Sequence, residues 1–175
     1  MKTLPLVEQF QYGLDAPICL TWELTYACNL SCVHCLSSSG RRDPRELTTG
    51  QCRAVIDELE RMQVFYVNIG GGEPTVRPDF WELVDYATAH RVGVKFSTNG
   101  IRITPERARR LAASDYVDVQ ISLDGATEQV NDAVRGPGGL PDRPGRRRVR
   151  VPVRDPRQLP GGQCSRARRV RRGLA

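Results

Sequence analysis

The sequence predicts an α/β fold, a partial (β/α) barrel of about four βα units. The first observation behind this prediction is that four short segments alternate apolar and polar residues with period two, as strands do. The second is that helical patterns lie between these segments. Strand and helix alternating at this spacing give right-handed βα units and a parallel sheet. The predicted strands cover residues 18–24, 65–69, 94–98 and 117–123.

Each predicted strand has one polar face and one apolar face. Fully buried parallel strands are usually unbroken runs of Val, Ile and Leu. A side that faces solvent would explain the pattern in any one strand, whereas four in succession favour a hollow, partly closed barrel around a polar cofactor. The polar faces are formed by Thr21 and Glu23, by Tyr66 and Asn68, by Lys95 and Ser97, and by Asp118, Gln120 and Ser122.

Three helices are predicted between the strands, each with a start signal. Thr48 and Gln51 have the spacing of a capping box, which begins the first helix. Pro78 stands near the start of the second, and Thr104 followed by Pro105 begins the third. The apolar helix faces consist of Cys52, Val55, Ile56, Leu59 and Met62; of Phe80, Leu83, Val84 and Ala87; and of Ala108, Leu111 and Ala112.

Charge is distributed unevenly along the 175 residues. Up to Gly136 there are 14 Lys+Arg against 18 Asp+Glu, whereas the rest of the chain has 12 Arg, no Lys and 2 Asp. The net charge of +6 therefore comes from the C-terminal segment. Residues 1–17 have a single Lys and no continuous apolar stretch, and no run of about 18 apolar residues is present anywhere. We therefore expect a cytoplasmic protein without a membrane partner.

Cys28, Cys32 and Cys35 form a C-x3-C-x2-C cluster directly after the first predicted strand. Three thiolates this close can hold three irons of a cubane cluster and leave the fourth iron open for chemistry. A zinc site is the alternative, with His34 folding back to complete a Cys3His set. Structural zinc usually takes two C-x2-C pairs, and the chain has no second pair. The pattern therefore favours the iron cluster.

The chain has six cysteines and no secretion signal, which indicates metal binding rather than disulfides. Cys19 lies in a strand pattern and Cys52 on the apolar face of a helix pattern, so both are predicted to be small core residues. Cys164 is given no role.

The later strands end in segments that can approach a ligand. Gly70-Gly-Gly-Glu-Pro74 follows the second strand, and glycines at the carboxyl end of a parallel strand let the backbone come close to a bound molecule. The third strand ends in Ser97-Thr-Asn-Gly100 and the fourth in Ser122-Leu-Asp-Gly125. Both are also ordinary turn sequences.

The cysteine spacing, followed by Gly-Gly-Glu-Pro after the next strand, resembles the signature of radical S-adenosylmethionine (radical SAM) enzymes. The resemblance implies a [4Fe-4S] cluster on Cys28, Cys32 and Cys35, whose open iron chelates the amino and carboxylate groups of the methionine moiety. In that superfamily the reduced cluster cleaves SAM to methionine and a 5'-deoxyadenosyl radical, which abstracts hydrogen from the substrate.

The resemblance also implies SAM contacts at the strand ends. The glycine segment would contact the methionine amino group, and the loops after the third and fourth strands would border the adenosine. Arg135 matches a family arginine that can pair with the methionine carboxylate, although a solvated arginine is equally compatible. The implied SAM-binding residues are Gly71, Gly72, Glu73, Pro74, Ser97, Asn99, Ser122, Asp124 and Arg135.

The stretch from Ala16 through the cysteines to Leu36-Ser-Ser-Ser-Gly40, the segment 62–70 and the chain on to Val134-Arg-Gly136 resemble the N-terminal part of the mycofactocin radical SAM maturases, and the resemblance covers residues 10–136. These oxidoreductases decarboxylate the C-terminal tyrosine of a ribosomally made precursor peptide and join it to the neighbouring valine. A separate peptide-binding protein presents the peptide, and a reductant supplies electrons. Another peptide- or haem-modifying radical SAM enzyme is the alternative within the enzyme class. Outside it, the alternative is a non-catalytic iron-sulfur-binding fragment.

Three regions are expected: a lead-in over residues 1–15, the partial barrel over 16–136, and a basic tail over 137–175. In the tail, 24 of 39 residues are Arg, Pro or Gly, a composition that cannot bury a core. We expect this tail to be disordered or the product of a frameshift. We expect the chain to be a truncated, inactive form, and we assign no catalytic residue in it. The tail lacks aromatic residues, so it is expected to bind nucleic acid only weakly, if at all.

Overall fold

The computed structural model describes residues 8, 13–14 and 16–139 and confirms the predicted α/β class. Its four strands pair in parallel in the order β1-β2-β3-β4, as expected for successive βα units. The strands are β1 (Cys19–Thr25), β2 (Tyr66–Gly71), β3 (Gly93–Thr98) and β4 (Val117–Ile121). The helices are α2 (Thr49–Arg61), the short 3-10 helix η1 (Pro74–Val76), α3 (Phe80–Ala89), α4 (Pro105–Ala112) and α5 (Glu128–Arg135).

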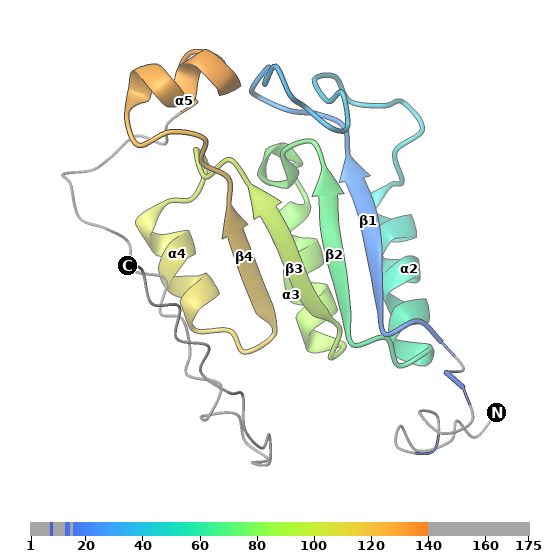
Figure 1. Cartoon of the computed structure of the whole chain (residues 1–175). Helices are drawn as coiled ribbons and strands as arrows, with labels where there is room; N and C mark the ends of the chain where they lie inside the picture. Colours follow the sequence, from blue (N-terminus) through green and yellow to red (C-terminus); the bar gives the residue numbers. More distant parts are fainter. Residues whose placement is uncertain (1–7, 9–12, 15, 140–175) are drawn as a thin grey trace.

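All four strands point the same way, so their carboxyl ends meet at one edge of the sheet. Figure 1 shows the four arrowheads at this edge, with the loop that follows β1 and helix α5 lying above them. The register places Glu23 beside Gly70 and Ser97 beside Gln120, close to these strand ends. The segments predicted to bind a ligand therefore share one end of the molecule.

The predicted helix starts are confirmed. Thr48 is the N-cap of α2, and the Gln51 side chain accepts a hydrogen bond from the Thr48 N–H at 2.9 Å, which completes the capping box. Thr104 caps α4 with Pro105 at the first helical position. Helix α5 was not predicted; it begins after Thr127, whose side chain accepts from the N–H of Val130. The alternating residues 117–123 predicted a strand, and the segment after them was not assigned a helix start.

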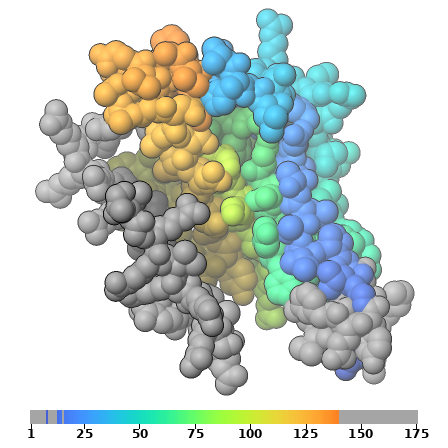
Figure 2. Space-filling view, in the orientation of Figure 1, coloured from blue at the N-terminus to red at the C-terminus, as the bar shows by residue number. Residues whose placement is uncertain are grey.

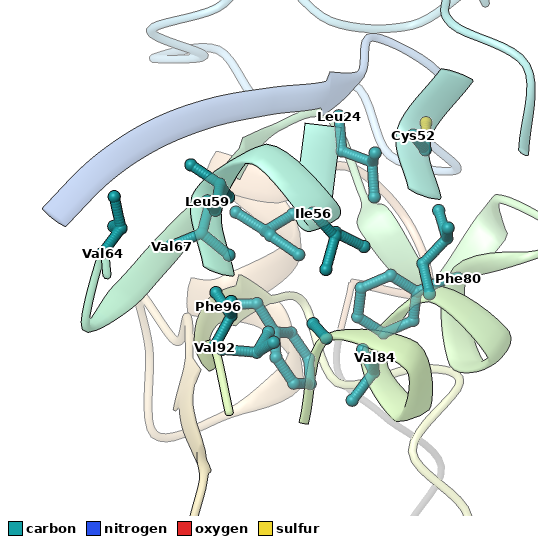
Figure 3. Packing of buried hydrophobic residues seen from close by; sticks show 14 of the residues in the cluster. Leu24, Cys52, Ile56, Leu59, Val64, Val67, Phe80, Val84, Val92 and Phe96 are labelled. Atoms are coloured by element: carbon teal, nitrogen blue, oxygen red, sulfur yellow. The ribbon is translucent and has the colours of Figure 1, made fainter. Parts of the chain in front are cut away.

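The core lies between the sheet and helices α2 and α3 (Figure 3). Phe80 and Phe96 meet edge to face with ring centroids 5.0 Å apart, and Cys52 is fully buried as predicted. The prediction for Cys19 is wrong, because this residue is exposed. Period two places it on the same face of β1 as Thr21 and Glu23, away from the helices.

The polar faces of the strands lie opposite the helices. In β4, Asp118 and Gln120 are exposed, and in β1 so are Thr21 and Glu23. The polar faces thus lie on one side of the sheet, and within the described residues nothing closes over them. β4 is an edge strand of the described sheet, and Ile121 on its other face is 39% exposed.

Arg77 is a buried cation that ties three segments together. Its guanidinium donates to the Asp79 carboxylate at 2.7 and 3.0 Å, to the Leu24 carbonyl at 3.2 Å and to the Leu47 carbonyl at 2.7 Å. Burial alone would raise the pKa of Asp79, but hydrogen bonds from Arg77 and Thr49 lower it. The end of β1, the segment before α2 and the start of α3 are thereby joined through one side chain.

The sequence predictions for residues 1–7, 9–12, 15 and 140–175 lie outside the described residues, and the three-region division stays a prediction. Among the helices that the structure describes, none is long and apolar enough to cross a membrane.

We predict that Arg77→Lys lowers the free energy of unfolding by about 3 kcal/mol, because lysine cannot satisfy two carbonyls and a carboxylate at once. Urea unfolding of the chain measures the change. The control is Arg53→Lys, whose exposed side chain pairs with Glu82 at 2.5 Å and should cost less than about 0.5 kcal/mol. Equal effects of the two substitutions would contradict the proposed joining role.

Candidate cofactor site

A cavity of about 280 Å³ lies at the carboxyl ends of the strands. It is bounded by the loop that carries the three cysteines, by the ends of β2 and β3, and by residues that follow β4. Its lining consists of Cys28, Leu30, Cys32, His34, Cys35, Leu36, Ser37 and Ser39 from the first loop; Gly71, Gly72 and Glu73; Ser97, Thr98 and Asn99; and Ser122 and Arg135.

All but two of the residues predicted from the sequence line this cavity. The exceptions are Pro74, which is buried at the start of η1, and Asp124, whose carboxylate pairs with Arg135. Sequence reasoning did not select four polar lining residues, namely His34, Ser37, Ser39 and Thr98. Their position next to the cysteines or at the end of a predicted strand was the available signal.

The cysteine loop is held closed at its base. The Cys28 N–H donates to the Gly40 carbonyl at 3.2 Å, and the Gly40 N–H donates to the Tyr26 carbonyl at 2.9 Å. Inside the loop, the Ser39 N–H donates to the Cys35 sulfur at 3.3 Å. The closed base places all three thiols on the cavity wall.

The thiols differ in electrostatic environment. Burial raises the pKa of Cys28, against the opposing effect of a hydrogen bond from the Leu30 N–H. Hydrogen bonds from Ser39 and Ser37 lower the pKa of Cys35 and favour its thiolate. Within the described residues, no group of three or more His, Cys, Asp or Glu side chains is arranged to hold a single metal ion.

Gly71 and Gly72 are required by a close approach of two backbones. A Cβ on Gly72 would lie 2.2 Å from the Ala27 carbonyl oxygen, and one on Gly71 would lie 2.4 Å from the Thr25 carbonyl oxygen. Gly71 also has φ +98°, a conformation that disfavours any side chain. The sequence predicted that the glycines make room for a ligand. The structure shows that they also make room for the main chain at Thr25, the end of β1, and at Ala27, just before the cysteines.

Glu73 joins the glycine segment to the end of β3. Its carboxylate is buried and accepts from the hydroxyl of Thr98 at 2.8 Å and from the N–H of Asn99 at 2.7 Å. It also accepts from the hydroxyl and the N–H of Thr75, at 2.5 and 3.1 Å. Three of these hydrogen bonds go to Oε1 and one to Oε2, so within this structure the carboxylate holds the strand ends together.

The other predicted side chains divide into two kinds. Asn99 is used internally, because its side-chain amide donates to Asn29 at 2.9 Å and its oxygen accepts from the Ile101 N–H at 3.0 Å. Ser97 and Ser122 line the cavity, and neither hydroxyl makes a hydrogen bond within the described residues. These two hydroxyls are therefore available to a polar ligand.

The donor set matches the chemistry of an iron-sulfur cluster. Three thiols from one loop supply one ligand each for three irons. The cavity beside them offers two serine hydroxyls and the side chain of Arg135, which is 11% exposed and whose Nε pairs with the Asp124 carboxylate. A largely buried guanidinium group on the cavity wall suits an anionic group on a ligand.

This combination of a parallel βα fold with a cysteine loop and a glycine segment on one cavity is the arrangement of a radical SAM domain. The model of the radical SAM superfamily matches residues 22–143, and the chain belongs to this superfamily of enzymes, which use a [4Fe-4S] cluster and SAM.

Among individual relatives, the chain is 85% identical over 135 residues to the mycofactocin maturase MftC of Mycobacterium tuberculosis and 86% identical to that of Mycolicibacterium smegmatis. The matches cover 77% of this chain and 34% of each relative, so the chain spans about a third of their length. It is 38% identical over 130 residues to an AdoMet-dependent heme synthase of Methanosarcina barkeri, covering 74% of this chain and 37% of that protein.

The fold is also found in solved structures. SuiB of Streptococcus suis bound to S-adenosylmethionine superimposes with a TM-score of 0.64 at 21% identity, over 77% of this chain and 32% of SuiB. This likeness confirms the fold.

We predict that Gly72→Ala lowers the free energy of unfolding by about 2–3 kcal/mol, because the new methyl must displace backbone atoms at Ala27. Urea unfolding measures it. Gly70→Ala is the matched control, since a Cβ there meets nothing within 4 Å and should change stability by less than about 1 kcal/mol. Unchanged stability in Gly72→Ala would refute the close approach.

Proposed function

We propose that this cavity holds the [4Fe-4S] cluster on Cys28, Cys32 and Cys35 and SAM beside it, along the ends of β2, β3 and β4. The supporting observation is that the three thiols and the polar groups predicted to bind SAM line one cavity. When bound, the cluster supplies the electron that cleaves SAM. The protein's own part is to orient SAM and to keep it next to the cysteine loop.

The proposed roles of the side chains follow from their surroundings. Arg135 lines the cavity with a side chain only 11% exposed, so it would pair with the methionine carboxylate at low solvent screening. The hydroxyls of Ser97 and Ser122 would hydrogen-bond the polar parts of the nucleoside. Asn99 and Glu73 are occupied by hydrogen bonds within the protein, so they would shape the site and leave direct recognition to the backbone and to other side chains.

For the whole protein we propose the activity of a mycofactocin maturase, the oxidative decarboxylation of the C-terminal tyrosine of a precursor peptide and its cross-linking to valine. The support is the identity of 85–86% with mycofactocin maturases over 135 residues. The proposed partners are the precursor peptide, its separate peptide-binding protein and a reductant, and the proposed location is the cytoplasm. The same fold occurs in SuiB bound to its precursor peptide SuiA, with a TM-score of 0.60.

Modification of a haem precursor is the second candidate, because an AdoMet-dependent heme synthase is 38% identical over a similar stretch. The much higher identity with the mycofactocin maturases favours the peptide substrate. Both classes use the same two cofactors, so the proposed roles of the cavity residues fit either one.

We predict that anaerobic reconstitution gives a brown protein with roughly four irons per chain, and that Cys32→Ala loses them because only two thiolates remain. Iron and zinc are measured by elemental analysis. Cys19→Ser is the control, since Cys19 is exposed and its strand lies outside the cysteine loop. Stoichiometric zinc without iron would refute the cluster and favour the zinc alternative.

We further predict that the reconstituted 175-residue chain, reduced with dithionite, forms 5'-deoxyadenosine slowly and leaves the precursor peptide unchanged, even with the peptide-binding protein present. Among the described residues the polar face of the sheet is open and no strand pairs with the outer edge of β4, so we expect water to reach the site. Liquid chromatography of the nucleoside and mass spectrometry of the peptide measure both results.

The Cys32→Ala chain is the control for cleavage, and it should form no 5'-deoxyadenosine. Loss of CO2 and two hydrogens from the peptide would show that this chain is a complete peptide maturase. A modified porphyrin in a parallel reaction would favour the haem candidate.

A further inference from the structure

Helix α5 lies directly against the cysteine loop, although the two are about a hundred residues apart in the sequence. The N–H of Val33 donates to the carbonyl of Val134 at 2.9 Å. Figure 1 and the space-filling view in Figure 2 show the helix, in orange, beside this loop, in blue, at the carboxyl end of the sheet. A main-chain hydrogen bond thus joins the cysteine loop to the last helix of the described structure.

Asp124 lies at the junction between the two elements. Its Oδ2 is 2.5 Å from Nε of Arg135 on α5 and 3.6 Å from Nε2 of His34 in the cysteine loop. Its own N–H donates to Oδ1 of Asn131 at 3.1 Å, and Asn131 is fully buried in α5. The carboxylate therefore faces one group from each element, while its backbone is anchored to the helix.

Asp124 does not line the cavity, but Arg135 does. The Arg135 side chain is 11% exposed and that of Asp124 is 29% exposed. A cation with so little access to water is costly without a counter-charge, and the structure gives Arg135 this one carboxylate partner among the described residues. The Arg135 Nε faces the Asp124 carboxylate at 2.5 Å, so a ligand in the cavity would be bound by the rest of the guanidinium group.

We propose that Asp124 is a positioning residue, which holds the Arg135 side chain at the cavity and docks α5 onto the cysteine loop, instead of contacting SAM as the sequence implied. The proposal rests on the proposed function in one respect, that Arg135 binds the SAM carboxylate. Its docking part is independent of any ligand.

The first experiment is a double-mutant cycle on SAM affinity, measured by equilibrium dialysis with the cluster-reconstituted chain. Asp124→Asn and Arg135→Ala should each weaken SAM binding about tenfold. If Asp124 acts through Arg135, the double variant should be no more than about twofold weaker than Arg135→Ala alone. If instead the two losses of SAM affinity multiply, so that the double variant binds about a hundredfold more weakly than the unchanged chain, Asp124 contacts SAM itself and the proposal is overturned.

The second experiment needs neither cluster nor SAM, so it separates failure of this proposal from failure of the proposed function. Amide hydrogen exchange is followed by NMR in the unreconstituted chain. In Asp124→Asn the Val33 amide should exchange about tenfold faster, because the docking of α5 that covers its hydrogen bond is weakened. The Met62 amide, bonded to the Glu58 carbonyl at 2.9 Å, should not change.

Asp118→Asn is the matched control for both experiments. Asp118 lies on β4, is exposed and pairs with Lys95 at 3.6 Å, well away from α5. It should change neither SAM affinity nor exchange of the Val33 amide by more than about twofold. Unchanged exchange of the Val33 amide in Asp124→Asn, or an equal effect of Asp118→Asn, would overturn the docking role.

Discussion

The buried carboxylate of Glu73 is the interaction on which the site depends. Its hydrogen bonds reach the hydroxyl of Thr98 and the N–H of Asn99, while its own N–H donates to the Ala27 carbonyl at 2.9 Å. The ends of β1, β2 and β3 are therefore connected through a single residue. A buried anion is tolerable only when donors replace its water, and here four donors do so. The strand ends cannot separate without uncovering it.

Arg77 has the complementary role one turn further along the chain. It brings a buried positive charge to the Leu24 and Leu47 carbonyls and to Asp79, on the side of the strand ends where α2 and α3 begin. Glu73 and Arg77 flank the 3-10 helix η1 and fix its two ends. Hydrogen bonds of Glu73 and Arg77 thus hold the carboxyl ends of the strands in place, although most of the apolar core lies away from these ends, between the sheet and helices α2 and α3.

The fold and most of the site could be predicted because their signals are local. Alternation with period two, the capping box at Thr48 and the spacing of three cysteines are properties of short segments. What escaped prediction depends on partners far away in the sequence. Glu73 lines the cavity, but its hydrogen bonds to the end of β3 had no signal in the sequence. Cys19 was expected in the core, and the face of β1 that it occupies is fixed only by the side on which the helices pack.

The contact between Gly72 and the Ala27 carbonyl also has a thermodynamic consequence. Two backbones without room for a methyl group between them cannot shift independently, so the cysteine loop and the glycine segment respond to a ligand as one body. When one ligand orders its own segment, it also orders the segment that binds the other ligand, so the second ligand loses less conformational entropy on binding. Such linkage is reciprocal, and each cofactor would raise the affinity of the site for its neighbour by the same factor.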